Sequence, residues 1–460
     1  MNPYLSKGFA PVENEIEIDE LVIEGNWPRE ISGTLYRIGP NPRFTPIPPY
    51  NPLMGDGMVH AFNIAEGVVS YRNRWVRTRQ WELENEAGRA LFSTSGDPRL
   101  HDPSVAGVPT DGVANTNVAW HAGRLLALEE GHPPIELEAS TLETKRVWTF
   151  GERLRNNMTA HPKIDPDTGE MIFFANEPGR RFNGEIVWYL VNERGEVLLE
   201  RRIEAPFSSI VHDFAVTRDF VVFLTCPLTI SVSRAVAGGP PLAWEPERST
   251  RIGVTRRDGS DDIRWFEKAP SFVWHVVNAW NDGDRITIDV CEQQAPAFPR
   301  ADGSTTRPAS WRQRFNRWVL DPSGRIESRR MSDQVSEYPR IDERHAMQPT
   351  RHSYFSCHGG PGTEDLFHRG IAHFDHGAAR MRTFSAGKTC AVSEPVFVPT
   401  SETAAEGDGW LLCVIYDEAN DHSHLALFDA QRIERGPVAR AMVGRRVPMG
   451  FHGCWVGSAG

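Results

Sequence analysis

Four of the 16 histidines occupy similar places along the chain. His161, His212 and His275 each stand at the head of an expected β-hairpin, and His452 lies in the segment MGFHGCW near the C-terminus. Neutral imidazole is a good ligand for iron, copper, nickel and zinc, so histidines that converge in space would form a metal site. A set of nitrogen ligands without thiolate or carboxylate does not match a closed structural zinc site and leaves positions open on a metal that prefers more than four ligands.

The elements that would position these histidines repeat along the chain. NTNVAWHAGRLLALEE and TAHPKIDPDTGEMIFFANE are two of many segments with an extended run, a short polar turn and a second β-rich run, and helical periodicity is scarce. Many antiparallel units without βαβ alternation are typical of a β-propeller, and this length suits about seven blades of four strands. We therefore predict an all-β, seven-bladed β-propeller.

In a propeller the inner strand of every blade lines the central channel, so residues at the starts of successive inner strands face one axis. The four histidines are separated by 51, 63 and 177 residues, which corresponds to about one, one and three blades. A single histidine is more often a hydrogen-bonded interior or surface residue than a metal ligand. We interpret the other twelve histidines in this way.

Composition excludes several classes of protein. The net charge of −11 argues against nucleic acid as the main partner, because phosphate binding needs clustered Lys and Arg. No apolar run approaches the roughly 20 residues that span a bilayer, and the N-terminus lacks the features of a signal peptide, so we expect a cytoplasmic protein without a transmembrane segment. The six cysteines are scattered without a CxxC pair, which suggests neither a disulfide framework nor a thiolate zinc site.

A metal-bound histidine usually donates its second N–H to a carboxylate, so a histidine site predicts glutamates close to its ligands. Glu130 closes LLALEE, Glu337 opens EYPRIDER and Glu394 opens EPVFVP, each at the end of an apolar or extended stretch. Taken alone, each is more often an ordinary surface or ion-paired carboxylate.

Several motifs of the chain resemble those of a known family. GTLYRIGPNPRF, GDGMVHAF, TAHPKIDPDTGEM, VHDFAVT, HVVNAW, EYPRIDER, SEPVFVP and the terminal HGCWV are similar, in order and over nearly the whole chain, to motifs of the carotenoid cleavage oxygenases. The resemblance implies a single propeller domain over residues 1–460, with loops that cap a metal-bearing axis. It also implies a non-haem Fe(II) held by four ligands that match His161, His212, His275 and His452.

The same resemblance implies roles for residues around the iron. Glu130, Glu337 and Glu394 match glutamates that support the histidine ligands. Thr116, in NTNV, matches a position whose side chain leans toward an open site on the iron and would restrict what binds there. Trp120 and Trp274, like Phe451, flank expected inner-strand positions and are candidates to line an apolar substrate tunnel.

The implied activity is the cleavage of a C=C bond of a hydrophobic conjugated alkene with O2, giving two carbonyl products. WEPERSTRIGVTRRDG and TAAEGDGWLL look closest to bacterial members that act on stilbenes, alkenyl phenols or apocarotenals. Our first expectation is an apocarotenoid or stilbene-type alkene. The alternatives are an alkenyl phenol of the isoeugenol or vinylguaiacol type, an isomerase or hydrolase like the vertebrate retinoid isomerase, and a propeller that only binds a partner.

The chain departs from the family pattern at two positions. Phenol-cleaving members carry a tyrosine and a lysine that bind the substrate's 4-hydroxyl, and the matching positions here are Ser95 and Glu129. A lysine would stabilise a phenolate, whereas an ionised Glu129 would repel one, most strongly in a dry cavity. The hypothesis is that catalysis here does not depend on phenolate activation.

Overall fold

The strands form because apolar and polar side chains alternate along them and short turns reverse the chain. In β5 (Val68–Trp75) buried and more exposed residues alternate, and this strand pairs with β4 (Gly57–Ala65) in a register from Met58–Trp75 to Ala65–Val68. Glu66 and Gly67 make the turn, both with positive φ (53° and 81°), as the primed turns of tight hairpins require. This hairpin is one of the many strand–turn–strand units that the alternation of side chains predicts along the chain.

The computed structural model describes residues 2–95, 97–180, 182–358 and 366–458. Its chain divides into two compact units. The first, unit 1, comprises Met1–Ala160, Phe367–Gly370 and Phe384–Gly460, and the second, unit 2, comprises His161–Leu366 and Ile371–Thr383. The expectation of one domain over residues 1–460 stays a prediction.

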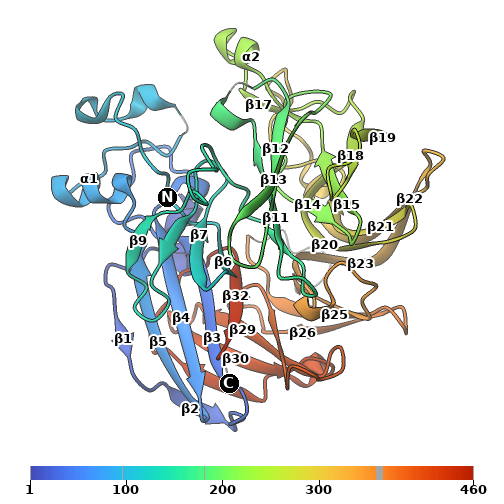
Figure 1. The fold of residues 1–460 in the computed structure, drawn as a ribbon. Coiled ribbons are helices and arrows are strands. Elements are labelled where there is room, and N and C mark those ends of the chain that lie inside the picture. Colours follow the sequence, from blue (N-terminus) through green and yellow to red (C-terminus); the bar gives the residue numbers. More distant parts are fainter. Residues whose placement is uncertain (1, 96, 181, 359–365, 459–460) are drawn as a thin grey trace. The chain divides into compact units, whose positions relative to one another are not determined.

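Unit 1 contains three antiparallel sheets among its described residues, with strand orders β1-β5-β4-β3-β32, β2-β31-β30-β29-β27 and β6-β7-β8-β9, and β28 also pairs with β29. The C-terminal strand β32 lies beside β3 near the other end of the chain (Figure 1). The strands besides β4 and β5 are β1 (Glu17–Ile18), β2 (Val22–Gly25), β3 (Gly33–Pro40), β6 (Asn117–His121), β7 (Arg124–Leu128), β8 (Ile135–Leu137), β9 (Thr144–Val147), β27 (Cys390–Val392), β28 (Val396–Pro399), β29 (Gly409–Asp417), β30 (His422–Asp429), β31 (Ala439–Met442) and β32 (Gly453–Gly457).

Unit 2 holds the remaining described sheets: β10-β11-β12-β13, β14-β15-β18-β19, the pair β16-β17, and β20 to β26 in chain order, except that Gly370 of β25 and residues 384–385 of β26 belong to unit 1. The last sheet is two four-stranded blades that share the 15-residue strand β23. The strands are β10 (Lys163–Ile164), β11 (Met171–Asn176), β12 (Glu185–Val191), β13 (Val197–Glu204), β14 (Phe214–Val216), β15 (Phe220–Thr225), β16 (Leu228–Ile230), β17 (Leu242–Trp244), β18 (Thr250–Arg256), β19 (Arg264–Lys268), β20 (Phe272–Asp282), β21 (Arg285–Gln293), β22 (Arg314–Leu320), β23 (Ile326–Arg340), β24 (His352–Cys357), β25 (Gly370–Asp375) and β26 (Arg380–Ser385).

Helices are few in the part of the chain that the structure describes. α1 (Arg79–Ala87) starts at Thr78, whose hydroxyl accepts a hydrogen bond from the Trp81 N–H, and ends at Gly88 with φ of 69°. α2 (Val232–Val236) is a single turn in the connection between β16 and β17. None of the described helices has the length and apolar character that crossing a bilayer requires.

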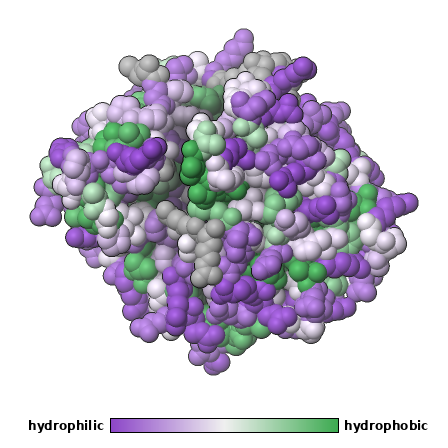
Figure 2. All heavy atoms as spheres, turned by 90° about the horizontal axis from the view of Figure 1, so that it is seen from above, coloured by the Kyte–Doolittle hydropathy of each residue, from purple (hydrophilic) through white to green (hydrophobic). Residues whose placement is uncertain are grey.

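Each unit buries its own apolar side chains between neighbouring sheets. In unit 1 one cluster joins residues of β3, β4 and β5 to residues of β28 to β31, and in unit 2 another joins β15 and β18 to β20, β21 and β22. Polar side chains cover most of the face seen in Figure 2, with apolar ones scattered between them. Apolar packing therefore holds neighbouring blades together within each unit, and polar functional residues are expected at the ends of the strands.

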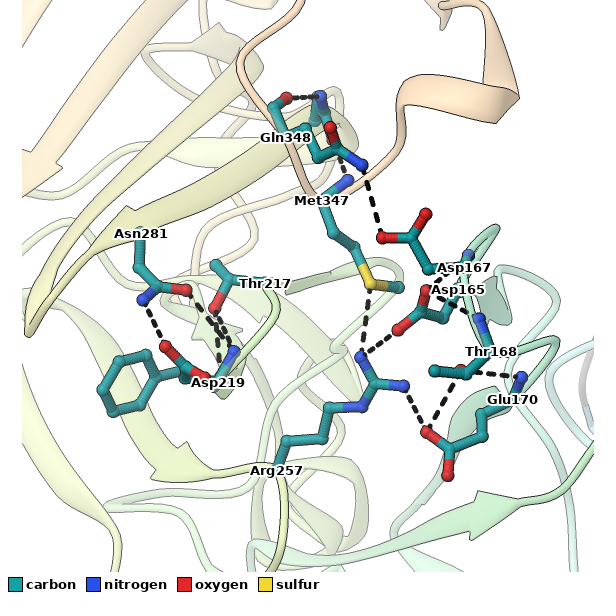
Figure 3. A network of polar contacts seen from close by, with 12 residues as sticks. Asp165, Asp167, Thr168, Glu170, Thr217, Asp219, Arg257, Asn281, Met347 and Gln348 are labelled. Carbon is teal, nitrogen blue, oxygen red and sulfur yellow. Dashed lines mark hydrogen bonds and ion pairs between the residues drawn. The ribbon is translucent and has the colours of Figure 1, made fainter.

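A buried arginine holds the β10–β11 hairpin of unit 2. Arg257 follows β18, and its guanidinium donates to Asp165 and Glu170 at 2.5 Å each, on the two sides of the hairpin turn, and lies 3.6 Å from the sulfur of Met347 (Figure 3). The Gln348 amide donates to Asp167 in the same turn. These bonds fix the turn of a hairpin whose first strand begins just after His161.

Candidate metal centre

Three of the predicted histidines stand at the edge strands of unit 2. His161 comes two residues before β10, and His212 comes two residues before β14. His275 lies inside β20, where the pairing with β21 shifts between Val273 and Val276. Because such a bulge changes the direction of the side chains, it allows a residue within a strand to reach the same place as residues ahead of a strand.

The three imidazoles meet at their Nε2 atoms. The Nε2 atoms of His161 and His212 are 3.0 Å apart, and those of His212 and His275 are 3.3 Å apart. Two imidazole nitrogens bound to one ion at about 2.1 Å lie about 3.0 Å apart at a right angle and about 3.4 Å apart at a tetrahedral angle. The spacing therefore fits ligands of one transition-metal ion, and all three donors are nitrogen.

Glu337 sets the tautomer of His275. Its Oε2 accepts a hydrogen bond of 2.5 Å from His275 Nδ1 and another from the backbone N–H of Tyr338. A proton held on Nδ1 leaves the lone pair on Nε2, the atom that faces His212. Tyr338 has φ of 51°, and its ring lies 5.6 Å from the His275 ring, so the backbone is held in an unfavourable conformation beside the histidine.

Unit 1 repeats this arrangement with the fourth predicted histidine. His452 immediately precedes β32 and is 5% exposed, and its Nδ1 donates to Glu394 Oε1 at 2.9 Å. Glu394 Oε2 accepts the N–H of Gly453 at 3.0 Å. The proton held on Nδ1 leaves a lone pair on His452 Nε2, as it does on His275 Nε2 in unit 2.

Thr116 is attached to His452 through the backbone. The Thr116 carbonyl accepts the N–H of His452 at 3.2 Å, and its hydroxyl donates to Asn115 Oδ1 at 2.9 Å. The fully buried Asn115 amide donates in turn to the carbonyls of Leu53 and Gly55. Unit 1 thus fixes both the place and the hydroxyl direction of Thr116 next to a candidate ligand.

Comparisons with known proteins agree with this chemistry. Residues 9–457 match the family model described as retinal pigment epithelial membrane protein. The chain is 36% identical over 468 residues to isoeugenol monooxygenase of Pseudomonas putida, covering 99% of this chain and 98% of the relative. The chain belongs to the carotenoid cleavage oxygenase family. The resemblance seen in its motifs is confirmed.

Solved members of the family have the same fold. The crystal structure of Pseudomonas brassicacearum lignostilbene dioxygenase superposes with a TM-score of 0.94 at 32% identity, covering 100% of this chain and 99% of that one. Cobalt-substituted apocarotenoid oxygenase of Synechocystis superposes with a TM-score of 0.88 at 26% identity over 98% of both chains. The chain is therefore a seven-bladed β-propeller and an oxygenase, an oxidoreductase, as predicted.

In this carotenoid cleavage oxygenase each of the seven blades carries one polar candidate residue on or just before its edge strand, and the second half of β23 is the edge strand of one blade. Those of unit 1 are Thr116 before β6, Glu394 before β28 and His452 before β32. Those of unit 2 are His161, His212, His275 and, where β23 begins to pair with β24, Glu337. Glu130 differs, because it follows the second strand β7 and is half-buried. Its predicted support of a histidine stays a prediction.

Glu129 has a partner that sequence reasoning missed. It is 8% exposed, and its Oε1 forms a short hydrogen bond with His132 Nδ1. Gly112, with φ of 86°, makes room for the pair, because a Cβ there would lie 1.9 Å from Glu129 Oε1 and 2.6 Å from His132 Nδ1. The i, i+3 spacing of the two residues after β7 was the available signal. The position that matches the family's lysine thus carries a carboxylate–imidazole pair.

Ser95 lies in the loop that follows α1. Its hydroxyl is hydrogen-bonded to Ser93 Oγ at 2.8 Å and accepts the N–H of Asp97 at 3.1 Å. These bonds stay within the loop, and its contact with substrate stays a prediction. Trp120 lies on β6 with 36% of its surface exposed, so it is available to a ligand, and its role also stays a prediction.

The other two aromatic candidates lie beside histidines of their own units. Trp274 is half-buried, and its ring meets the His212 ring edge to face, with centroids 4.9 Å apart at 90°. Phe451 precedes His452 and lines a small cavity of unit 1 together with Leu35, Val396 and Glu394. Both residues place apolar surface next to a candidate ligand.

Proposed function

We propose that this chain is a non-haem Fe(II) oxygenase that uses O2 to cleave a C=C bond of a conjugated alkene into two carbonyl products. The observation that carries the proposal is the convergence of three histidine Nε2 atoms at the spacing of ligands to one ion, within a member of the carotenoid cleavage oxygenase family. The donor set is nitrogen only, which suits iron and leaves positions open for reactants.

We propose that His452 is the fourth ligand, with His161, His212 and His275. Glu394 fixes the tautomer of His452 as Glu337 fixes that of His275, so both imidazoles offer a lone pair on Nε2. Neutral imidazoles leave the dipositive charge of the ion intact, and Fe(II) supplies the redox chemistry for O2 when bound. Glu130 is proposed to support a ligand histidine in the same way.

The protein's own residues would then orient the substrate and exclude water. Trp274 offers a flat apolar wall beside His212, and Phe451 offers one beside His452. Thr116, whose hydroxyl proton is committed to Asn115, offers no proton to a reactant next to it. Holding one double bond in a dry apolar site removes the entropy of a random encounter, which is a large part of the barrier.

We propose conjugated aryl alkenes as the first substrate class, because relatives named for isoeugenol and lignostilbene share 36% and 32% of their residues with this chain. Apocarotenals are the second class. They are favoured by one observation, the buried carboxylate of Glu129 where phenol-cleaving relatives would have a lysine.

The test is product analysis by mass spectrometry after Fe(II)-loaded protein has been incubated in air with a 4-hydroxystilbene, an alkenyl guaiacol and an apocarotenal, while O2 uptake is recorded. We expect two carbonyl products from at least one alkene, with O2 consumed in step. His212→Ala, which removes a candidate ligand, should give no product. Geometric isomers formed without O2 uptake would support an isomerase instead, and no conversion of any of the three would contradict the proposal.

A further inference from the structure

A single buried carboxylate connects the three histidine-bearing strands of unit 2. Asp213, 4% exposed, accepts hydrogen bonds from Lys163 Nζ at 2.7 Å and the Phe214 N–H at 2.8 Å on its Oδ1. Its Oδ2 accepts the Val276 N–H at 2.7 Å. Lys163 belongs to β10, Phe214 to β14 and Val276 to β20, so one side chain joins three edge strands of three neighbouring blades.

Each bonded group lies one or two residues from a candidate metal ligand. Asp213 directly follows His212, Val276 directly follows His275, and Lys163 comes two residues after His161. Successive side chains of an extended chain point to opposite sides, so a bond made at Asp213 holds the backbone from which His212 projects the other way. The bulge of β20 places the Val276 N–H where the carboxylate reaches it.

We infer that Asp213, together with Lys163, is a positioning residue that holds His161, His212 and His275 at metal-binding spacing before an ion arrives. The inference rests on the proposed function only for the assignment of these histidines as ligands. Asp213 touches no reacting group, and the Lys163 ammonium balances its charge. The pair therefore acts by holding the backbone in position rather than by changing the electrostatic potential at the metal site.

Metal affinity is sensitive to this kind of support. Metal–nitrogen distances are fixed to within about 0.2 Å, so three ligands on separate strands bind strongly only if the strands are held in register. Residues behind the ligands typically change metal affinity about 10- to 100-fold when they are removed. Loss of the Asp213 carboxylate would also leave the Lys163 ammonium and the Val276 N–H without their shared acceptor.

The experiment is titration of metal-free full-length protein with Co(II), followed by the visible ligand-field absorption and by competition with a chelator. We expect Asp213→Ala to bind Co(II) about tenfold or more weakly, and the milder Asp213→Asn, which keeps one acceptor oxygen, to lie between it and the wild type. Lys163→Met should weaken binding less. Adding Lys163→Met to Asp213→Ala should cause little further loss, because Lys163 acts through Asp213.

The matched control is Lys268→Met. Lys268 forms a comparable buried ion pair with Glu292 at 2.5 Å in the same unit, but it joins β19 to β21 rather than the histidine-bearing strands. The substitution Lys268→Met should lower the melting temperature of the metal-free protein, because it removes an ion pair that contributes to stability. It should leave the Co(II) affinity within about twofold of the wild type, because this ion pair does not hold the histidine-bearing strands.

The outcomes separate this inference from the proposed function. Wild-type protein that fails to bind one Co(II) per chain would contradict the ligand assignment itself. Wild-type binding that Asp213→Ala and Asp213→Asn leave unchanged would overturn only the positioning role. An equal loss of affinity in Lys268→Met would also overturn it, because the effect would then follow general stability.

Discussion

At the scale of single residues, the histidines depend on the carboxylates behind them. Glu337 and Glu394 each accept the Nδ1–H of a histidine and one backbone N–H. The backbone donor to Glu337 is the next residue, Tyr338, and the donor to Glu394 is Gly453, which follows His452. One carboxylate therefore fixes both the tautomer of the ring and the local backbone. The sequence predicted these two glutamates because carboxylates support metal-bound histidines, but it could not predict the second bond, which depends on how the backbone turns.

Replacing Glu337 by glutamine tests this support. The amide still accepts the His275 Nδ1–H but carries no charge, so the imidazole becomes a weaker donor to a metal. We expect Co(II) affinity to fall about 10- to 100-fold, measured by chelator competition. Glu185→Gln is the control, since Glu185 is a similarly buried carboxylate of unit 2 paired with Arg202. Equal affinities for Glu337→Gln and the wild type would contradict the prediction.

The Glu129–His132 pair makes a prediction about substrate phenols. The Glu129 carboxylate stands where a lysine would supply a positive charge, so the pair does not stabilise a phenolate as a lysine would. We expect 4-hydroxy and 4-methoxy forms of one stilbene to be cleaved with kcat/KM values within about threefold of each other. Glu129→Lys should shift the preference toward the 4-hydroxy form, with Glu129→Gln as the charge-neutral control. Rapid cleavage of the 4-hydroxy form by the wild type, with the 4-methoxy form untouched, would refute the idea.

At the scale of elements, the structure contains the expected hairpins at the predicted segments. The pairs β6–β7, β10–β11, β14–β15 and β20–β21 all coincide with predicted strand–turn–strand segments, because alternation and turn residues are local signals. The bulge in β20 and the shared strand β23 were not predicted. Both depend on contacts with neighbouring strands, which a local pattern does not contain.

The strands β24 and β25 carry a second group of histidines, which the sequence alone indicates to be hydrogen-bonded interior or surface residues. His376, just after β25, accepts a hydrogen bond from Arg317 on Nδ1 and bonds to Ser353 Oγ, both at 2.9 Å. Burial, with the nearby charges of Arg317 and His352, lowers the pKa of His376 from 6.5 to about 3. Burial likewise lowers the pKa of His373 to about 3.

These lowered pKa values predict acid sensitivity. Below pH 6.5 the unfolded chain binds a proton at His376 that the folded chain does not accept until about pH 3, so stability falls as the pH decreases across this window. The cost is at most about 1.4 kcal/mol per pH unit for each histidine. His376→Gln keeps a neutral acceptor and donor, and denaturant titrations from pH 7 to about pH 4 should show a shallower loss of stability than in the wild type. Parallel curves for the two proteins would contradict this.

At the scale of the whole molecule, the repeated pattern predicted the fold class, which is confirmed, and the family motifs predicted the candidate residues of the site, whose roles stay predictions. Asp213 and Lys163 could not be recognised, although both stand in quoted motifs. An acidic residue and a lysine 50 positions apart look like solvated surface until the blades bring them together. The sequence pattern predicts local structure, but it does not predict which residues of different blades come into contact.

The most direct test of the whole account is to titrate metal-free protein with Fe(II) and follow both cleavage products of the best alkene by mass spectrometry. We predict that product formation rises linearly and breaks at one Fe(II) per chain, and that His212→Ala shows no such rise. Equal turnover by the metal-free protein, or full activity of His212→Ala, would contradict the claim that these histidines hold the iron that cleaves the double bond.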